Sequence, residues 1–135
     1  MTDLPNRLLL GDRLAQAIHA AERMGQVFTL AYLDLNGFKQ INDTHGHDAG
    51  DEVLKVVASR LQAGLRASDT VARLGGDEFV VLLSPAQGRA EAERVLARLL
   101  DAVARPITLA SGAPVGVGSA LGLAHTPTTA ARRMR

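Results

Sequence analysis

The sequence feature that most constrains the fold is a pair of short apolar runs on either side of a glycine turn, VARLGGDEFVVLL at residues 71–83. Such runs joined by a few turn residues are typical of a β-hairpin. The second run, FVVLL, is apolar at every position, which favours a central strand covered on both faces. A hairpin needs only the glycines, so the adjacent acids Asp77 and Glu78 call for a separate explanation.

The composition limits the class of protein. The chain has 135 residues, of which 47% are hydrophobic and 21% are charged, and its net charge is +1. These values fit one folded domain and exclude a disordered segment or a strongly basic nucleic-acid-binding surface. The absence of cysteine excludes disulfides and thiolate metal sites. Because we find no signal-peptide pattern and no apolar run of the roughly twenty residues that span a bilayer, we expect a cytoplasmic chain without a membrane span.

Hydrophobic periodicity predicts the elements around the hairpin. It indicates an amphipathic helix over residues 8–21, a strand over 27–34, a helix from about Asp51 to Gly64, and a third helix that ends before Pro106. The stretch NDTHGHDAG is rich in turn formers and predicts a loop. The stretch PITLASGAPVGVGSALGLA supplies further strand material, and the final HTPTTAARRMR has no apolar periodicity.

The order of these elements indicates the fold class. Helices interleave with strands, and both parallel and antiparallel pairings are expected. This pattern favours a layered α/β (α+β) domain of ferredoxin-like type, with a mixed central sheet flanked by helices, over a purely parallel doubly wound sheet.

Three carboxylates are candidates for chemistry. Asp34 ends the predicted strand, at the sheet edge where functional groups collect and where the hairpin tip with Asp77 and Glu78 can also arrive. Like charges that meet repel one another unless a cation lies between them, and oxygen ligands of this kind select Mg²⁺ together with substrate phosphates. The alternative is that Asp77 and Glu78 are ordinary hairpin-turn residues.

Neighbouring residues carry groups suited to a nucleotide. Gly75 and Gly76 have no Cβ, so a base or a triphosphate can lie against the backbone. The turn NGFK offers backbone N–H groups and the ammonium of Lys39 to phosphate oxygens. The alternative for Lys39 is a solvated surface lysine.

A second group of polar residues is suited to a guanine edge. Asn42 offers a paired donor and acceptor, and Asp51 can accept two N–H bonds. The alternative for Asp51 is an acid favoured by the dipole at a helix N-terminus. His45 and His47 are more typical of hydrogen-bonding turn residues than of zinc ligands.

These motifs together resemble the GGDEF family of diguanylate cyclases. TDLPNR is similar to the family's LTGLPNR, LDLNGFKQINDTHGHDAGDEVL to its DIDxFKxINDxxGHxxGDxxL block, and VARLGGDEF to its signature hairpin. The resemblance implies a nucleotidyl-cyclase-type fold, with residues 1–135 as a single catalytic domain. It also implies condensation of two GTP into cyclic di-GMP with release of pyrophosphate, at a half-site in each subunit of a homodimer, and a sensory domain in the parent protein.

The resemblance assigns roles to residues. Asp34, Asp77, Glu78 and the carbonyl of Leu35 would hold Mg²⁺ or Mn²⁺. Asp77 would accept the proton of the ribose 3′-hydroxyl, Glu78 would support it, and Lys39 would stabilise charge on the phosphates. The substrate-binding positions that it implies are Phe38, Lys39, Asn42, His47, Asp51, Gly75 and Gly76.

Arg66 and Asp69 fit the family's RxxD motif, which forms an inhibitory site for cyclic di-GMP. The alternative is an exposed arginine at a helix end followed by a turn aspartate. Arg94 and Arg98 are candidates for a second arginine at this site.

Several departures from the family pattern lead to an alternative function. Asn36 and Leu74 replace an aspartate and an aromatic residue, and the family's terminal helix, which contacts phosphate, has no counterpart before Arg135. We therefore expect a C-terminally truncated catalytic domain. The alternatives are a catalytically weak or inactive module that binds GTP or cyclic di-GMP, and a polymerase-palm-like nucleotidyltransferase, which the small net charge disfavours.

Overall fold

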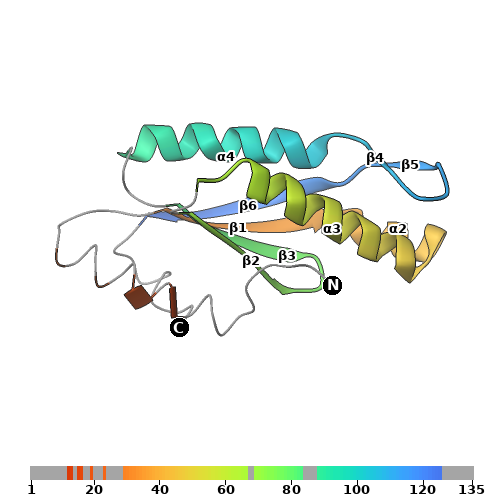
Figure 1. Ribbon diagram of the computed structural model, residues 1–135, viewed down its shortest axis with the longest axis horizontal. Coiled ribbons are helices and arrows are strands. Elements are labelled where there is room, and N and C mark those ends of the chain that lie inside the picture. The colour runs from red at the N-terminus through yellow and green to blue at the C-terminus, as the bar shows by residue number, and fades with distance from the viewer. Residues whose placement is uncertain are drawn as a thin grey trace.

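Four strands form one sheet in the computed structural model, and helices lie over one of its faces (Figure 1). The structure describes residues 12, 13, 15, 16, 19, 23, 29–66, 69–83 and 88–125. The strands of the sheet are β1 (Thr29–Asn36), β2 (Thr70–Gly75), β3 (Glu78–Leu83) and β6 (Gly118–His125). The helices are α2 (Phe38–His45), α3 (His47–Ala63) and α4 (Gly88–Ala104), and β4 (Ile107–Thr108) pairs with β5 (Pro114–Val115) in a small separate hairpin.

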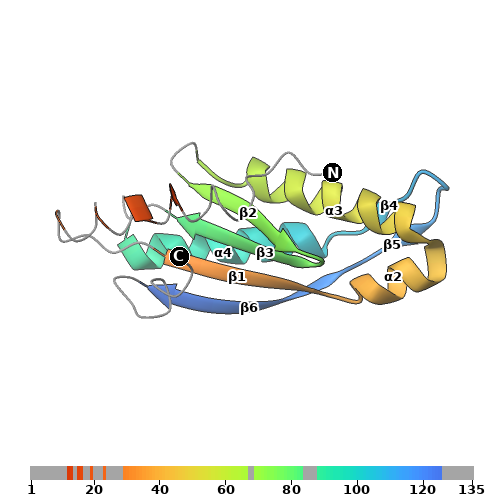
Figure 2. The same cartoon turned by 90° about the horizontal axis from the view of Figure 1, so that it is seen from below.

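The sheet has the strand order β2-β3-β1-β6, as Figure 2 shows. The main elements follow one another as β1, the α2–α3 pair, β2, β3, α4 and β6, which is the βαββαβ order of a ferredoxin-like fold and confirms the predicted α+β class. We expected a mixed sheet, whereas every pairing described in it is antiparallel. The reason is that β3 lies between β1 and β2 and pairs with both of them. β1 and β2 therefore run in the same direction but are not neighbours in the sheet.

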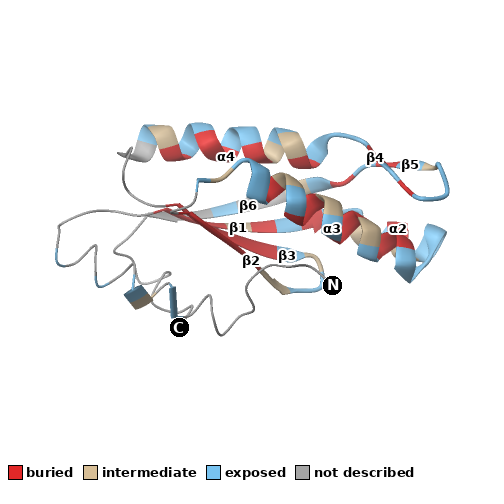
Figure 3. Cartoon of the chain, in the orientation of Figure 1, coloured by how far each residue is buried: buried red, intermediate tan, exposed pale blue. Residues whose placement is uncertain are grey.

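Alternation along the strands divides residues between the two faces of the sheet. Ala31, Leu33 and Leu35 of β1 belong to the hydrophobic core together with Phe79 of β3 and the apolar stripes of α3 and α4. Figure 3 shows this buried layer between the helices and the sheet. Because successive side chains point to opposite faces, Asp34 points away from the helices.

The segment between β1 and α3 differs from the prediction. The loop expected over residues 42–50 is helical, and α3 begins at His47 rather than near Asp51. Turn-forming residue types gave the wrong interpretation because Ile41 is buried and anchors α2. Gly46, at a φ of 92°, separates the two helices, and its N–H donates to the carbonyl of Asn42 at 2.8 Å. A single glycine thus ends one helix and starts the next.

The other predicted elements agree with the structure where it describes them. The hairpin of β2 and β3, the end of α3 at Gly64 and the end of α4 before Pro106 are confirmed. Within the predicted helix over residues 8–21, the described residues Asp12, Arg13, Ala15, Gln16 and His19 are helical, and the rest lie outside the described residues. The strand predicted over residues 27–34 corresponds to β1. Residues 27 and 28 lie outside the described residues. The predicted tail also lies outside it, except for its first residue, which ends β6.

Arg60 of α3 joins the two long helices. Its guanidinium donates to the carbonyls of Ala102 at 3.0 Å, Arg105 at 2.7 Å and Pro106 at 2.9 Å. These carbonyls lie at the C-terminal end of α4, where backbone acceptors lack helical partners and a positive charge is favourable. Arg60 therefore fixes the end of α4 against α3.

We predict that Arg60→Ala lowers the free energy of unfolding by about 1–2 kcal/mol, because three carbonyls lose a charged donor. The matched control is Arg105→Ala, which removes only an exposed ion pair with Asp101 at 3.6 Å and should cost less than about 0.5 kcal/mol. Urea unfolding followed by circular dichroism measures both. Equal losses in the two variants would contradict the role of Arg60.

Candidate functional site

The register of β1 and β3 brings two predicted site carboxylates together. Asp34 lies directly opposite Glu78, and both residues are exposed. Side chains opposite each other on antiparallel strands share a face, with Cβ atoms about 4.5–5.5 Å apart. The strand end and the hairpin tip therefore meet, as expected from the sequence. Tyr32 lies on the same face, and burial raises the pKa of its phenol.

A backbone hydrogen bond also joins Asp77 to the end of β1, where Asp34 lies. The N–H of Leu35 donates to the carbonyl of Asp77 at 3.1 Å. In a strand the N–H and C=O of one residue point to the same side, so the carbonyl of Leu35 also faces the hairpin tip. Among the described backbone groups, the Asp77 N–H does not return a bond to this carbonyl. Leu35 thus presents a backbone oxygen beside Asp77.

The turn itself depends on Gly76. Gly76 has a φ of 48° and Asp77 a negative φ, which matches a two-residue hairpin turn with glycine at its first central position. A Cβ built at Gly75 or Gly76 would meet nothing within 4 Å, so the space above the tip is open. Sequence reasoning missed Arg73, whose Nε donates to the carbonyl of Gly76 at 3.1 Å and braces the tip. Its place three residues before that glycine was the only signal.

The oxygen donors at this edge suit a hard divalent cation. Carboxylates of Asp34 and Asp77 and the carbonyl of Leu35 are the ligand types that Mg²⁺ takes, leaving positions for water and phosphate. Within the described residues, no group of three or more acidic or histidine side chains is arranged to hold an ion. The donor set therefore fits the ion in chemistry, and the three-carboxylate site stays a prediction.

Apart from Gly75 and Gly76, the predicted nucleotide-binding residues lie on α2 and at the start of α3. Phe38 and Lys39 are in the first turn of α2, directly after β1, and Lys39 is exposed. The first helical bond of α2 joins the Ile41 N–H to the Gly37 carbonyl at 3.2 Å, so the three preceding N–H groups have no helical partner. These N–H groups and Lys39 together offer donors next to Asp34.

The start of α3 carries the remaining predicted contacts. His47 is its first residue and is exposed, and Asp51 is the fifth and is also exposed. The acid in the first turn is Asp48. Asp51 therefore lies beyond the turn where the helix dipole favours an acid most, which weakens the purely structural explanation for it.

Arg66 and Asp69 form a closed turn between α3 and β2. The Asp69 carboxylate accepts from the Arg66 N–H at 3.0 Å, and the Asp69 N–H donates to the Arg66 carbonyl at 3.0 Å. The two side chains are also an ion pair at 3.6 Å, with Asp69 1% exposed and Arg66 44% exposed. Asp69 therefore shapes the turn, and Arg66 is the member of the motif that solvent reaches.

A cavity of about 270 Å³ adjoins this turn. Arg13, Leu65, Arg66, Asp69 and Thr70 are among its lining residues. Arg13 is thus a further arginine beside the RxxD motif, which sequence reasoning had not singled out.

The two arginines of α4 that we considered as partners of Arg66 differ in their contacts. Arg94 donates to Glu91 at 2.7 Å, which holds the pKa of that carboxyl below its usual range, and the charges of Arg98 and Arg66 act in the same direction. Both arginines are exposed. Helix α4 therefore carries two exposed arginines, of which Arg94 is already paired with Glu91.

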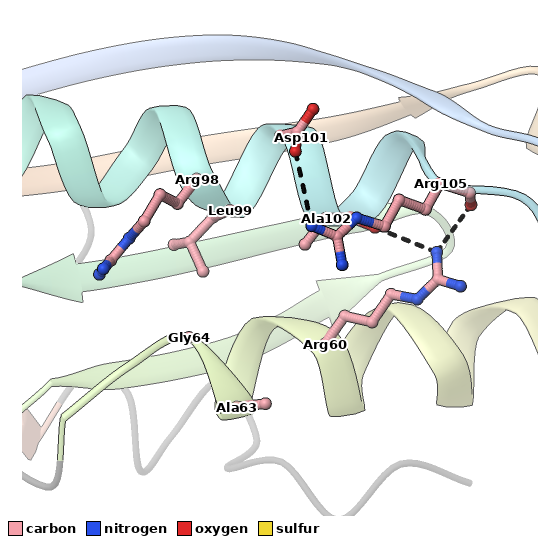
Figure 4. Close-up of a pocket in the computed structure, with 8 residues that line it drawn as sticks. All are labelled: Arg60, Ala63, Gly64, Arg98, Leu99, Asp101, Ala102 and Arg105. Atoms are coloured by element: carbon pink, nitrogen blue, oxygen red, sulfur yellow. Dashed lines mark hydrogen bonds and ion pairs between the residues drawn. The ribbon is translucent and has the colours of Figure 1, made fainter.

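Arg98 also lines a second hollow, of about 460 Å³, between α3 and α4 (Figure 4). Arg60, Gly64, Leu99 and Arg105 are among its other lining residues. At this hollow the guanidinium of Arg60 donates to carbonyls at the end of α4, and Arg105 forms an ion pair with Asp101. The hollow is separate from the carboxylates at the hairpin tip.

Comparison with known proteins identifies the family. The family profile "Diguanylate cyclase, GGDEF domain" matches residues 1–135. The chain belongs to the GGDEF family. The bifunctional diguanylate cyclase/cyclic di-GMP phosphodiesterase MucR of Pseudomonas aeruginosa is 44% identical over 127 residues, which cover 94% of this chain and 18% of MucR.

Solved structures of GGDEF domains share the fold of this chain. The crystal structure of the GGDEF domain of TpbB (YfiN) from P. aeruginosa matches with a TM-score of 0.90 and 41% identity, over 94% of this chain and 79% of that one. The GGDEF domain of DgcB from Caulobacter crescentus, solved in complex with cyclic di-GMP, matches with a TM-score of 0.84 and 31% identity, over 92% and 74% of the two chains.

This GGDEF chain spans less than a third of the full-length relatives, since it covers 18% of MucR and 29% of the diguanylate cyclase TpbB. In the part that the structure describes, no helix is long and apolar enough to cross a bilayer.

Proposed function

We propose that this GGDEF chain condenses two GTP into cyclic di-GMP with release of pyrophosphate. The observation that carries the proposal is the register of β1 and β3, which sets Asp34 opposite Glu78 and bonds Leu35 to Asp77. Membership of the family and the relatives named diguanylate cyclase support it. As GTP is an intracellular substrate, the proposal places the domain in the cytoplasm.

We assign the divalent cation, Mg²⁺ or Mn²⁺, to the oxygens of Asp34, Leu35 and Asp77, with Glu78 next to them. When bound, this cation neutralises phosphate charge and lowers the pKa of the ribose 3′-hydroxyl. The protein supplies the ligands from the end of β1 and from a tight hairpin turn, and the pairing of β1 with β3 holds the two in register.

The nucleotide binds along the edge formed by the hairpin tip, α2 and α3. The open space above Gly75 and Gly76 admits it against the backbone. Lys39 and the free N–H groups at the start of α2, including that of Phe38, bind its phosphates. We assign the guanine to Asn42, His47 and Asp51, on α2 and the start of α3.

In the reaction, Asp77 accepts the proton of a 3′-hydroxyl and Glu78 supports it. The 3′-oxygen of one GTP forms a bond to the α-phosphorus of the other, and the bond from that phosphorus to the pyrophosphate oxygen breaks. Two such steps close the ring and release two pyrophosphates. Positioning and charge neutralisation supply most of the catalysis in phosphoryl transfer, which suits a site without a nucleophilic side chain.

The stoichiometry supports a homodimer. The described residues offer one set of metal and nucleotide donors in each chain, whereas the reaction consumes two GTP. Two chains that face each other would bring two half-sites together, each with one GTP.

We predict that Asp77→Ala lowers cyclic di-GMP formation at least a hundredfold, because a metal ligand and a proton acceptor are lost together. The 135-residue chain is incubated with GTP and Mg²⁺ or Mn²⁺, without a primer, and the product is measured by chromatography. The matched control is Asp43→Ala, an exposed acid on α2, which should retain the wild-type rate.

Circular dichroism checks that both variants fold. Product formation by Asp77→Ala at the wild-type rate would refute the assigned site. A wild-type chain that binds GTP without converting it would favour the alternative, a binding module, and a requirement for a nucleic-acid primer would favour a polymerase-like transferase.

We also propose that cyclic di-GMP inhibits the enzyme at the cavity beside Arg66. The exposed part of the Arg66 side chain can donate two parallel bonds to a phosphate or a guanine, while buried Asp69 holds the turn. Arg13, which lines the same cavity, and Arg98, which is exposed on α4, are the candidate second arginines. The solved DgcB complex with cyclic di-GMP supports a product-binding role for this fold.

Arg66→Ala should raise the cyclic di-GMP concentration that half-inhibits the enzyme by about tenfold or more, because a charged donor to the ligand is lost. The initial rate without product should not change. Arg105→Ala, which changes an arginine at the other end of α4, serves as the control and should be inhibited like the wild type. Unchanged inhibition of Arg66→Ala would contradict the proposed product site.

A further inference from the structure

Gly50 of α3 lies against the side chain of Asn42 on α2. A Cβ built at Gly50 would overlap Oδ1 of Asn42 and would lie 2.8 Å from its Cγ and 3.2 Å from its Nδ2. Real Cβ atoms essentially never come closer than 3.0 Å to a heavy atom. The Asn42 carboxamide therefore occupies the volume in which any other residue at position 50 would place its Cβ.

The backbone conformation does not explain this glycine. Gly37, Gly46 and Gly76 have positive φ values, which glycine adopts at no steric cost, but Gly50 is not among the residues with positive φ. It lies inside α3, where glycine is less favourable than alanine by about 1 kcal/mol. Close approach of Asn42 is the feature of the structure that requires glycine here.

The contact involves only the end of the Asn42 side chain. The three atoms nearest to the built Cβ are all side-chain atoms of Asn42, and none belongs to the backbone of α2. A methyl group at position 50 would thus displace the carboxamide by rotation about its side-chain bonds while α2 and α3 keep their packing. Position 50 controls where the amide points.

The carboxamide is available to a ligand. Asn42 is half-buried, and no hydrogen bond from its side chain is found among the described residues. Its backbone carbonyl is held by the Gly46 N–H, so the residue is fixed at its main chain. Asp51, the next residue after Gly50, is exposed at the same place on α3. The position of Gly50 against Asn42 therefore limits where this amide can point, one residue before Asp51 along α3.

We propose that Gly50 is a positioning residue for base recognition. Because Gly50 has no side chain, the Asn42 carboxamide can lie against α3, one residue before Asp51. Asn42 and Asp51 can then bind the same guanine edge. This inference rests on the proposed function, in which Asn42 and Asp51 bind guanine. Gly50 does not touch the nucleotide itself and acts through Asn42.

The test is a double-mutant cycle with Gly50→Ala, Asn42→Ala and the combined variant. Binding of 3′-deoxy-GTP and 3′-deoxy-ATP to the full chain with Mg²⁺ is measured by calorimetry, because ligands without the 3′-hydroxyl cannot react. Gly50→Ala should weaken 3′-deoxy-GTP binding roughly three- to tenfold, the effect of one lost hydrogen bond, and should reduce the preference for guanine over adenine by a similar factor. Asn42→Ala should have the same effect.

The combined variant carries the decisive result. When the Asn42 amide is absent, a methyl group at position 50 has no amide to displace. The variant that combines Asn42→Ala with Gly50→Ala should therefore bind 3′-deoxy-GTP with the same affinity as Asn42→Ala alone. Full additivity of the two changes, or wild-type binding and base preference in Gly50→Ala, would overturn the inference.

Two controls separate this inference from other failures. Gly116→Ala places a methyl group where nothing lies within 4 Å, outside any helix, and should change neither binding nor base preference. The side-chain amide resonance of Asn42 in the ligand-free protein should shift in Gly50→Ala and not in Gly116→Ala, and an unshifted resonance would refute the steric contact. Failure of the wild-type chain to bind 3′-deoxy-GTP would refute the proposed function, and this inference with it.

Discussion

The antiparallel pairing of β1 with β3 is the constraint on which the rest of the site depends. Its register runs from Thr29 opposite Leu83 to Asp34 opposite Glu78, and it is extended by the bond from Leu35 to Asp77. A slip of one residue would turn Asp34 toward the core and Leu33 toward solvent. The burial of Leu33 and Leu35 under the helices therefore also fixes the direction of the carboxylate between them. Hydrophobic packing on one face of the sheet thus fixes the position of the Asp34 carboxylate on the other face.

Local sequence pattern was enough to predict the parts of the fold that are specified locally. The glycine turn with its apolar flanks predicted β2 and β3, and helical periodicity predicted α4, whose Ala92, Leu96 and Leu99 are buried as expected. The meeting of Asp34 with the hairpin tip also followed from a general rule about strand ends. The tip residue Gly76 has the positive φ that its turn requires, so residue type and conformation agree there.

Other features depend on contacts that are distant in sequence, and the pattern did not show them. The residue types of NDTHGHDAG favour turns, but the burial of Ile41 and the packing of α2 on α3 make this segment helical. The insertion of β3 between β1 and β2 made the sheet antiparallel, which no local signal specified. Arg73 at the hairpin tip and Gly50 next to Asn42 matter through single contacts, which depend on the folded structure and leave no pattern in the sequence.

The most direct test of the account is to locate the divalent cation in solution by the paramagnetic effect of Mn²⁺ on backbone amide signals. With GTP analogues absent, low Mn²⁺ should broaden the amide signals of Leu35, Asp77 and Glu78 before others, and excess Mg²⁺ should restore them, since both ions favour oxygen ligands. Broadening that begins elsewhere, or that affects Leu35 without the hairpin tip, would contradict the claim that the strand end and the tip form one site.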